Sequence, residues 1–200
     1  MSTSIMTIRQ KLLKGLYPFI MKFSQKGEKG KIMLKPNAVS AITHLGDFQI
    51  DLSNGELLKL KELNGKKVLL VNTASDCGYT GQFEELQHIQ NLYKDSLIII
   101  GFPANDFLEQ EKGADSNILN FCQVNYGVTF PIAKKSVVVK KSNQNLIFEW
   151  LSNPAKNGWN NQDPAWNFSK YLLSETGELL GYFGPAISPN DKRLLDLIAN

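Results

Sequence analysis

The chain has 200 residues, of which 42% are hydrophobic and 20% charged, and its formal net charge is +3. This composition excludes disordered and collagen-like chains and fits one globular domain with a sizeable core. No run of about eighteen apolar residues occurs, so the sequence predicts no membrane-spanning helix.

The first thirty-five residues form a basic leader. They hold eight Lys or Arg and one acid, Glu28, which gives them a charge of +7 and leaves −4 for the rest of the chain. Apolar residues recur three or four apart from Ile5 to Phe23, which predicts an amphipathic helix. Pro18 falls inside this pattern, so we expect a kink or a break there. A polar linker is predicted over residues 27–36.

The leader fits two roles equally well. It is either an amphipathic anchor on an anionic membrane surface or a helix that packs against the body or against a second copy. A secretory signal is less favoured, because Lys14, Pro18 and Lys22 interrupt the apolar stretch. Nucleic-acid binding is not expected, because no recognition motif accompanies the lysines. We therefore divide the chain into a leader with linker, 1–36, and a domain, 37–200.

Helical and strand patterns alternate after the linker. A hairpin is predicted over 41–52 around Gly46-Asp47, and continuous apolar runs predict buried strands at 67–74 and 97–102. Helices are predicted at 82–93, 116–124, 145–151 and after Pro189, a strand at 136–139, and a hairpin that pairs 169–173 with 179–183. This order is typical of an α/β, thioredoxin-like fold with a central mixed sheet flanked by helices, here with an N-terminal helical extension.

Cys77 follows the first buried strand and precedes the next helix. Free amide N–H groups and the positive end of a helix dipole meet at such a turn, and both favour a thiolate. Thr80 is the expected N-cap of that helix, and Glu84 and Glu85 complement its dipole. The alternative is that Cys77 is only a small buried hydrophobe. Its position, at the end of a strand where open α/β sheets bind ligands, favours a reactive role.

Three motifs resemble those of the glutathione peroxidase family. Residues 72–80 (NTASDCGYT) resemble its active-site signature, residues 102–111 (FPANDFLEQE) its second motif, and residues 166–168 (WNF) its third. The resemblance spans roughly residues 40–198 and implies a catalytic set of Cys77, Gln110, Trp166 and Asn167. An indole N–H and two carboxamides are neutral donors that can bind a sulfur anion.

Three positions depart from the family pattern. Ala104 stands where many members have cysteine, Asp106 where glutamine is common, and Lys112 where proline is common. Asp76 and Asp106 bring negative charge towards the proposed thiolate, which would raise its pKa if they were close and unpaired. We expect both carboxylates to point into solvent.

Cys122 lies in residues 120–127 (NFCQVNYG), which resemble the stretch that carries the resolving cysteine in thioredoxin-dependent members of the family. The resemblance implies that Cys77 forms a sulfenic acid with a hydroperoxide and then a disulfide with Cys122. Thioredoxin or glutathione would reduce that disulfide. If Cys122 sits on a formed helix, we expect that helix to unwind partly for the two Cα atoms to come within about 7 Å.

Other functions compete with this interpretation. One is a redox sensor that passes its oxidation to a partner protein, and another is a non-catalytic thioredoxin-like binding module. The intact set of Cys77, Gln110, Trp166 and Asn167 speaks against the latter. His44 and His88 have no supporting motif, so we expect no metal and no cofactor. We expect a cytoplasmic protein that could also touch a membrane through its leader.

Overall fold

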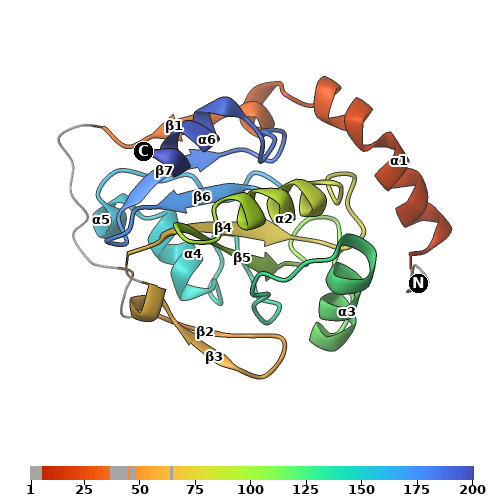
Figure 1. Cartoon of the computed structure of the whole chain (residues 1–200), viewed down its shortest axis with the longest axis horizontal. Helices are drawn as coiled ribbons and strands as arrows, with labels where there is room; N and C mark the ends of the chain where they lie inside the picture. The colour runs from red at the N-terminus through yellow and green to blue at the C-terminus, as the bar shows by residue number, and fades with distance from the viewer. Residues whose placement is uncertain (1–5, 37–44, 46–47, 64) are drawn as a thin grey trace.

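The computed structural model describes residues 6–36, 45, 48–63 and 65–200 (Figure 1). Its helices are α1 (Ile8–Phe23), α2 (Gln82–Leu92), α3 (Asp115–Tyr126), α4 (Leu146–Leu151), α5 (Pro154–Asn157) and α6 (Lys192–Ala199). Its strands are β1 (Ile32–Leu34), β2 (Gln49–Asp51), β3 (Leu57–Lys59), β4 (Lys67–Thr73), β5 (Leu97–Pro103), β6 (Lys170–Leu173) and β7 (Leu179–Phe183). Short 3-10 turns lie at Gly27–Gly30 and Leu60–Leu63.

A five-stranded mixed sheet lies at the centre of the molecule. Its strand order is β1-β7-β6-β4-β5, and β2 and β3 form a separate pair. Strand β4 runs parallel to β5 and antiparallel to β6. All seven residues of β4 are buried, which is the environment that its continuous apolar run predicts.

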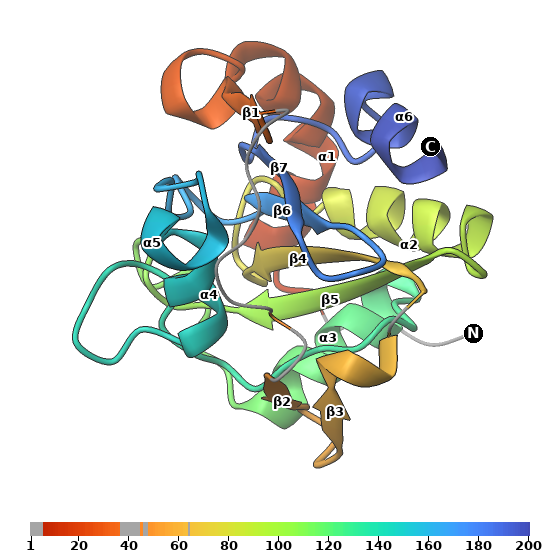
Figure 2. The same cartoon turned by 90° about the vertical axis from the view of Figure 1, so that its left-hand side faces the viewer.

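The side chains of β4 alternate between two apolar clusters, as the period of a strand requires. Leu69 and Val71 belong to the cluster that includes residues of α2, α3 and α6. Val68 and Leu70 belong to the cluster that includes residues of α4. Figure 2 shows α2 on one side of β4 and α4 on the other. The predicted mixed sheet with helices on both faces is therefore confirmed.

The strand predicted at 136–139 is wrong. Only an isolated bridge between Val137 and Gln144 occurs there. The neighbouring backbone groups have other partners: Val138 N–H donates to Asp106 Oδ2 at 2.8 Å, and Ser136 N–H donates to the Pro103 carbonyl at 3.0 Å. With these donors engaged by a side chain and a loop, no ladder forms.

The predicted polar linker over 27–36 is also wrong in part. Residues 32–34 are strand β1, which pairs antiparallel with β7, so that Met33 lies opposite Tyr182. Three consecutive apolar residues here complete the edge of the sheet. The division of the chain after residue 36, which remains a prediction, therefore puts one strand of the sheet on the leader's side.

The hairpin predicted over 41–52 lies mostly outside the described residues, because 37–44 and 46–47 are not among them. In the described part, β2 pairs with β3. Gly55, with φ of +89°, forms the turn between them, and its N–H donates to the Leu52 carbonyl at 3.0 Å.

Residues Ile8–Phe23 of the leader form one continuous helix, α1. It begins with a capping box, in which the Thr7 side chain accepts from Gln10 N–H and the Gln10 side chain accepts from Thr7 N–H. The helix runs through Pro18 to Phe23, so the predicted break does not occur. None of the helices in the described part of the chain is long and apolar enough to span a membrane.

Candidate active site

The turn that carries Cys77 connects β4 to α2. Gly81, not Thr80, is the N-cap of α2, and no side chain caps the helix. The predicted Thr80 cap is therefore wrong: Thr80 N–H instead donates to the Cys77 carbonyl at 3.2 Å and closes the turn ahead of the helix. Residues 75–81 form this connection, which we call the catalytic turn.

The Cys77 side chain is enclosed. The residue is 1% exposed, and burial raises the pKa of its thiol to about 11. Hydrogen bonds from the Tyr79 backbone and from the Asn167 and Trp166 side chains lower it, as does the charge of Lys29. In this closed arrangement burial outweighs the donors, which is the opposite of the thiolate expected from the position alone.

The structure brings the four predicted site residues together. Asn167 is fully buried, and its Nδ2 donates to Gln110 Oε1 at 3.0 Å in addition to the hydrogen bond with Cys77. Gln110 is tied to the catalytic turn by its carbonyl, which accepts from Asp76 N–H at 3.1 Å. Trp166 is half-buried beside Cys77. Within the described residues, Asn167 Oδ1 is buried and has no partner.

Asn72, from the first motif, holds the third motif in place. Its Nδ2 donates to the Trp166 carbonyl at 3.1 Å, and its Oδ1 accepts from Ser169 N–H at 3.0 Å. Phe168, between them, has a left-handed φ of +69° and donates its N–H to the Asn72 carbonyl. This strained connection fixes the direction of the Trp166 and Asn167 side chains.

Two consecutive left-handed residues precede Gln110. Leu108 and Glu109 have φ values of +51° and +54°. Such a conformation is unfavourable for residues with a Cβ, and it marks segments that their surroundings hold in place. The loop thereby turns Gln110 towards Asn167. No pattern in the sequence indicated this geometry.

Glu111 is a site residue that the sequence did not assign a role. It is 1% exposed, and its carboxylate accepts from both the backbone N–H and the hydroxyl of Ser75, each at 2.7 Å. Burial raises the pKa of Glu111 to about 7. This side chain anchors the start of the catalytic turn, and its place in the second motif was the available signal.

Lys29, from the leader, also reaches the site. Its ammonium lies 4.6 Å from the centre of the Trp166 ring, and its charge favours the Cys77 thiolate. The Lys29 carbonyl accepts from Ala186 N–H at 2.8 Å, which fixes the backbone beside β7. The leader lies outside the resemblance to the family, so no motif indicated this cation.

Of the two carboxylates expected in solvent, only one is partly exposed. About a third of the Asp76 side chain is exposed to solvent, and its carboxylate forms an ion pair with Arg9. The Asp106 expectation is wrong, because its side chain is 4% exposed and accepts from Val138 N–H and Lys141 Nζ. Both negative charges are therefore paired with cations.

Cys122 lies on α3 and is 1% exposed. Burial raises the pKa of its thiol, and the Glu111 charge raises it further. Both cysteines are free. Cys122 thus sits on a formed helix, which is the condition under which we expect α3 to unwind before a disulfide forms.

A polar cleft of about 340 Å³ opens beside Gln110. Ser75, Asp76 and Gln110 line it from the body, and Arg9 and Gln10 line it from the leader. Gln110 thus lies between this cleft and the buried Asn167, to which it is hydrogen-bonded. In the described parts of the chain no group of three or more His, Cys, Asp or Glu could hold a metal ion.

Comparison with known proteins places these residues in one family. Residues 45–152 match the family model "Glutathione peroxidase". The glutathione peroxidase homolog BsaA of Staphylococcus epidermidis is 46% identical over 144 residues, which are 72% of this chain and 90% of that protein. The glutathione peroxidase-like peroxiredoxin 2 of Saccharomyces cerevisiae is 38% identical over 160 residues, 78% of this chain and 98% of that protein.

A solved structure agrees. The crystal structure of GPX1 from T. cruzi superposes with a TM-score of 0.60 at 25% identity and covers 79% of this chain and 98% of its own. The predicted thioredoxin-like fold is confirmed, and the chain is a thiol peroxidase, an oxidoreductase that acts on hydroperoxides. With a family-model match over more than half of its length, this chain belongs to the glutathione peroxidase family.

Proposed function

We propose that Cys77 is the thiol that attacks the hydroperoxide. The thiolate sulfur bonds to one peroxide oxygen, the O–O bond breaks, and water or an alcohol leaves after taking up a proton, so that Cys77 becomes a sulfenic acid. One observation carries the assignment: three hydrogen-bond donors from Tyr79, Trp166 and Asn167 converge on the Cys77 sulfur.

The amides of the site serve to orient the peroxide. Asn167 Nδ2 is held by Gln110 and by Cys77, whereas the buried Asn167 Oδ1 has no partner among the described residues. That oxygen can accept a hydrogen bond from a hydroperoxide O–H placed beside the sulfur. Gln110, which also lines the polar cleft, can hold the second peroxide oxygen. None of these groups titrates, so the site works without a separate base.

Cys122 then resolves the sulfenic acid. Its sulfur attacks the Cys77 sulfur, a disulfide forms, and the hydroxyl leaves as water. Because Cys122 is buried on α3, the helix has to unwind locally before the two Cα atoms approach to within about 7 Å. Gly127, with φ of +63°, ends the helix and provides a point from which unwinding can begin.

A protein dithiol of the thioredoxin type restores the two thiols by exchange. The presence of a second cysteine supports this choice over glutathione, since an internal disulfide is the natural substrate of a dithiol. The name of the yeast relative, a peroxiredoxin, points the same way. Two unpaired thiols suit a reducing compartment, so we place the enzyme in the cytoplasm.

The leader supplies peripheral contact with a membrane in this proposal. One face of α1 packs on the body, and a row of large apolar residues on its other face stays exposed. The peroxidase cycle itself does not depend on this contact.

Peroxide-driven oxidation of reduced thioredoxin tests the cycle. The wild type should turn over continuously, and Cys77→Ser should be inactive. Cys122→Ser should consume about one equivalent of peroxide and then stop, because its sulfenic acid has no resolving partner. Sustained turnover by Cys77→Ser would refute the assignment, and unimpaired thioredoxin-coupled turnover by Cys122→Ser would remove the resolving step.

A further inference from the structure

Helix α1 presents two different faces. Tyr17, Ile20 and Met21 pack against the apolar cluster around α2 and α3. Opposite them, spaced three or four apart, lie five large apolar residues that are 42–88% exposed: Ile8, Leu12, Leu16, Phe19 and Phe23. We call these two sides the inner face and the outer row. Figure 1 shows α1 along the side of the molecule, beside α2 and α3.

The inner face covers the catalytic turn. Gln10 Nε2 donates to the Ser75 carbonyl at 3.1 Å, and Arg9 pairs with Asp76. At Gly78 a Cβ would lie only 2.8 Å from Ile20 Cδ1, so the helix approaches the residue next to Cys77 as closely as a glycine permits. These contacts help to explain why Cys77 is buried in a protein whose chemistry needs it exposed.

The same helix also bridges α2 and α3. Lys14 pairs with Glu84 at 2.6 Å, and its ammonium lies 4.5 Å from the centre of the Tyr126 ring at the end of α3. The Tyr17 hydroxyl donates to Glu85 at 2.7 Å. Because Tyr126 is in the last turn of α3, the contact with Lys14 restrains the helix that must unwind for Cys122 to move.

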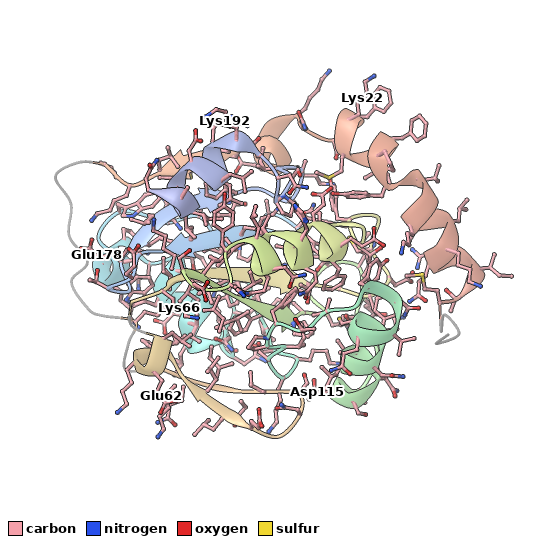
Figure 3. The ribbon with its side chains drawn as sticks, viewed as in Figure 1. Lys22, Glu62, Lys66, Asp115, Glu178 and Lys192 are labelled. Carbon is pink, nitrogen blue, oxygen red and sulfur yellow. The ribbon has the colours of Figure 1, made fainter. Side chains whose placement is uncertain are left out.

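The outer row is flanked by positive charge. Lys11 and Lys22 lie on one side of it on the helix surface, and Arg9 lies on the other. Figure 3 shows Lys22 pointing away from the body. In the described part of the chain neither Lys11 nor Lys22 forms an ion pair. An apolar row bordered by cations is the pattern of a helix that lies in the interface of an anionic bilayer.

A second copy is a poorer partner for this surface. Two leaders facing each other would bring together segments that carry +7 each, and like charges oppose such an interface. An anionic bilayer instead offers hydrocarbon to the outer row and phosphates to the lysines. Charge complementarity therefore selects the lipid surface.

We propose that α1 is a lipid-responsive cover. An anionic bilayer binds the outer row and draws the whole helix away from the catalytic turn, and this movement exposes Cys77. The cover can respond because one of its anchors is exchangeable. Arg9, at the border of the outer row, leaves Asp76 and pairs with a lipid phosphate, and this difference in partners shifts the helix from body to membrane. The proposal rests on Cys77 being the reacting thiol.

Vesicle binding tests the outer row. The full chain should sediment with vesicles of phosphatidylglycerol and phosphatidylcholine but not with phosphatidylcholine alone. The double variant Leu12→Glu/Phe19→Glu should lose at least about tenfold in affinity, because two apolar anchors become charged. Leu146→Glu, at a residue 64% exposed on α4, is the matched control and should bind normally. Absence of binding, or equal binding to both vesicle types, overturns the proposal.

The alkylation rate of Cys77 tests the cover. On a Cys122→Ser background, anionic vesicles should accelerate reaction with iodoacetamide about tenfold or more, since an exposed thiol ionises more readily. Arg9→Gln/Lys14→Gln should react fast without vesicles. Binding without acceleration would overturn the proposal. Because alkylation involves no peroxide, a chain that opens on lipid but reduces no peroxide would refute the cycle and leave the cover standing.

Discussion

Cys77 and Cys122 are equally buried but differ in what surrounds their sulfur atoms. Each is 1% exposed, and burial raises the pKa of both thiols. Around Cys77, three hydrogen bonds and the Lys29 charge oppose that effect. Around Cys122, the Glu111 charge adds to it. In the proposed cycle, the set of hydrogen-bond donors, rather than burial, therefore distinguishes the attacking Cys77 from the resolving Cys122.

Removing one of the hydrogen-bond donors to Cys77 should have the largest effect on its reactivity. We predict that Asn167→Ala slows the oxidation of Cys77 by peroxide about 10²- to 10³-fold, which is the cost typical of losing one donor to a developing anion. Rapid-mixing kinetics on the Cys122→Ser background measures it. Asn160→Ala, which removes another fully buried amide, is the control and should weaken the fold without slowing oxidation. Equal rates for Asn167→Ala and the parent would show that the donor is not used.

Glu111 should make the stability of the folded protein depend on pH. The folded protein holds the Glu111 proton up to a pKa of about 7, whereas the unfolded chain releases it near 4.5. Between these values the unfolded state binds fewer protons, so stability falls as pH rises, by about 3 kcal/mol for this group. In the Glu111→Gln variant, the loss of stability that Glu111 causes between these pH values should disappear.

Urea unfolding of wild type and Glu111→Gln at pH 4.5 to 7.5 measures that difference. Glu62→Gln, at an exposed carboxylate, is the control and should follow the wild type. Parallel stability curves for wild type and Glu111→Gln would mean that the Glu111 carboxyl ionises normally in the folded state.

The sequence predicted the parts of the fold that rest on local pattern. The apolar runs of β4 and β5 and the helical spacing of α2 and α3 are long enough to show their period. Strand β1 was missed because three residues show no alternation and their partner, β7, lies far along the chain. Residues 136–139 were wrongly assigned because Asp106, thirty-two positions before Val138, takes a backbone donor that a strand would use.

The sequence predicted which residues lie together in the candidate site but not the electrostatics of that site. Cys77, Gln110, Trp166 and Asn167 were predicted from motifs. In the structure Asn167 forms hydrogen bonds with both Cys77 and Gln110, and Trp166 forms one with Cys77. The raised pKa of Cys77 depends on how tightly tertiary packing encloses it, which no local rule gives. The Lys29 cation approaches Trp166 for the same reason, through the pairing of β1 with β7.

Disulfide formation should loosen α3. We predict that amide hydrogen exchange in residues 118–126 is about tenfold faster or more in the oxidised protein than in the reduced one, because Cys122 leaves the helix. Exchange in α2 serves as the internal control and should change little. Equal protection of α3 in both forms would mean that the two cysteines meet without unwinding.

Lys29 should contribute the smallest effect. Lys29→Gln removes the charge that favours the thiolate, so we predict a several-fold slower oxidation of Cys77 at neutral pH and a higher thiol pKa. Rapid mixing with peroxide at neutral pH measures the first effect, and alkylation rates across pH measure the second. Lys26→Gln, at an exposed lysine three residues away, should leave them unchanged. If both variants slow the reaction equally, the effect comes from the general charge of the leader.

Trapping the first oxidation product tests the assignment of Cys77 most directly. One equivalent of hydrogen peroxide is added to Cys122→Ser and to Cys77→Ser in the presence of dimedone, and the labelled residue is identified by peptide mass spectrometry. We predict a sulfenic acid adduct on Cys77 in the first variant and none on Cys122 in the second. Labelling of Cys122 at a comparable rate, or of neither cysteine, would contradict the account.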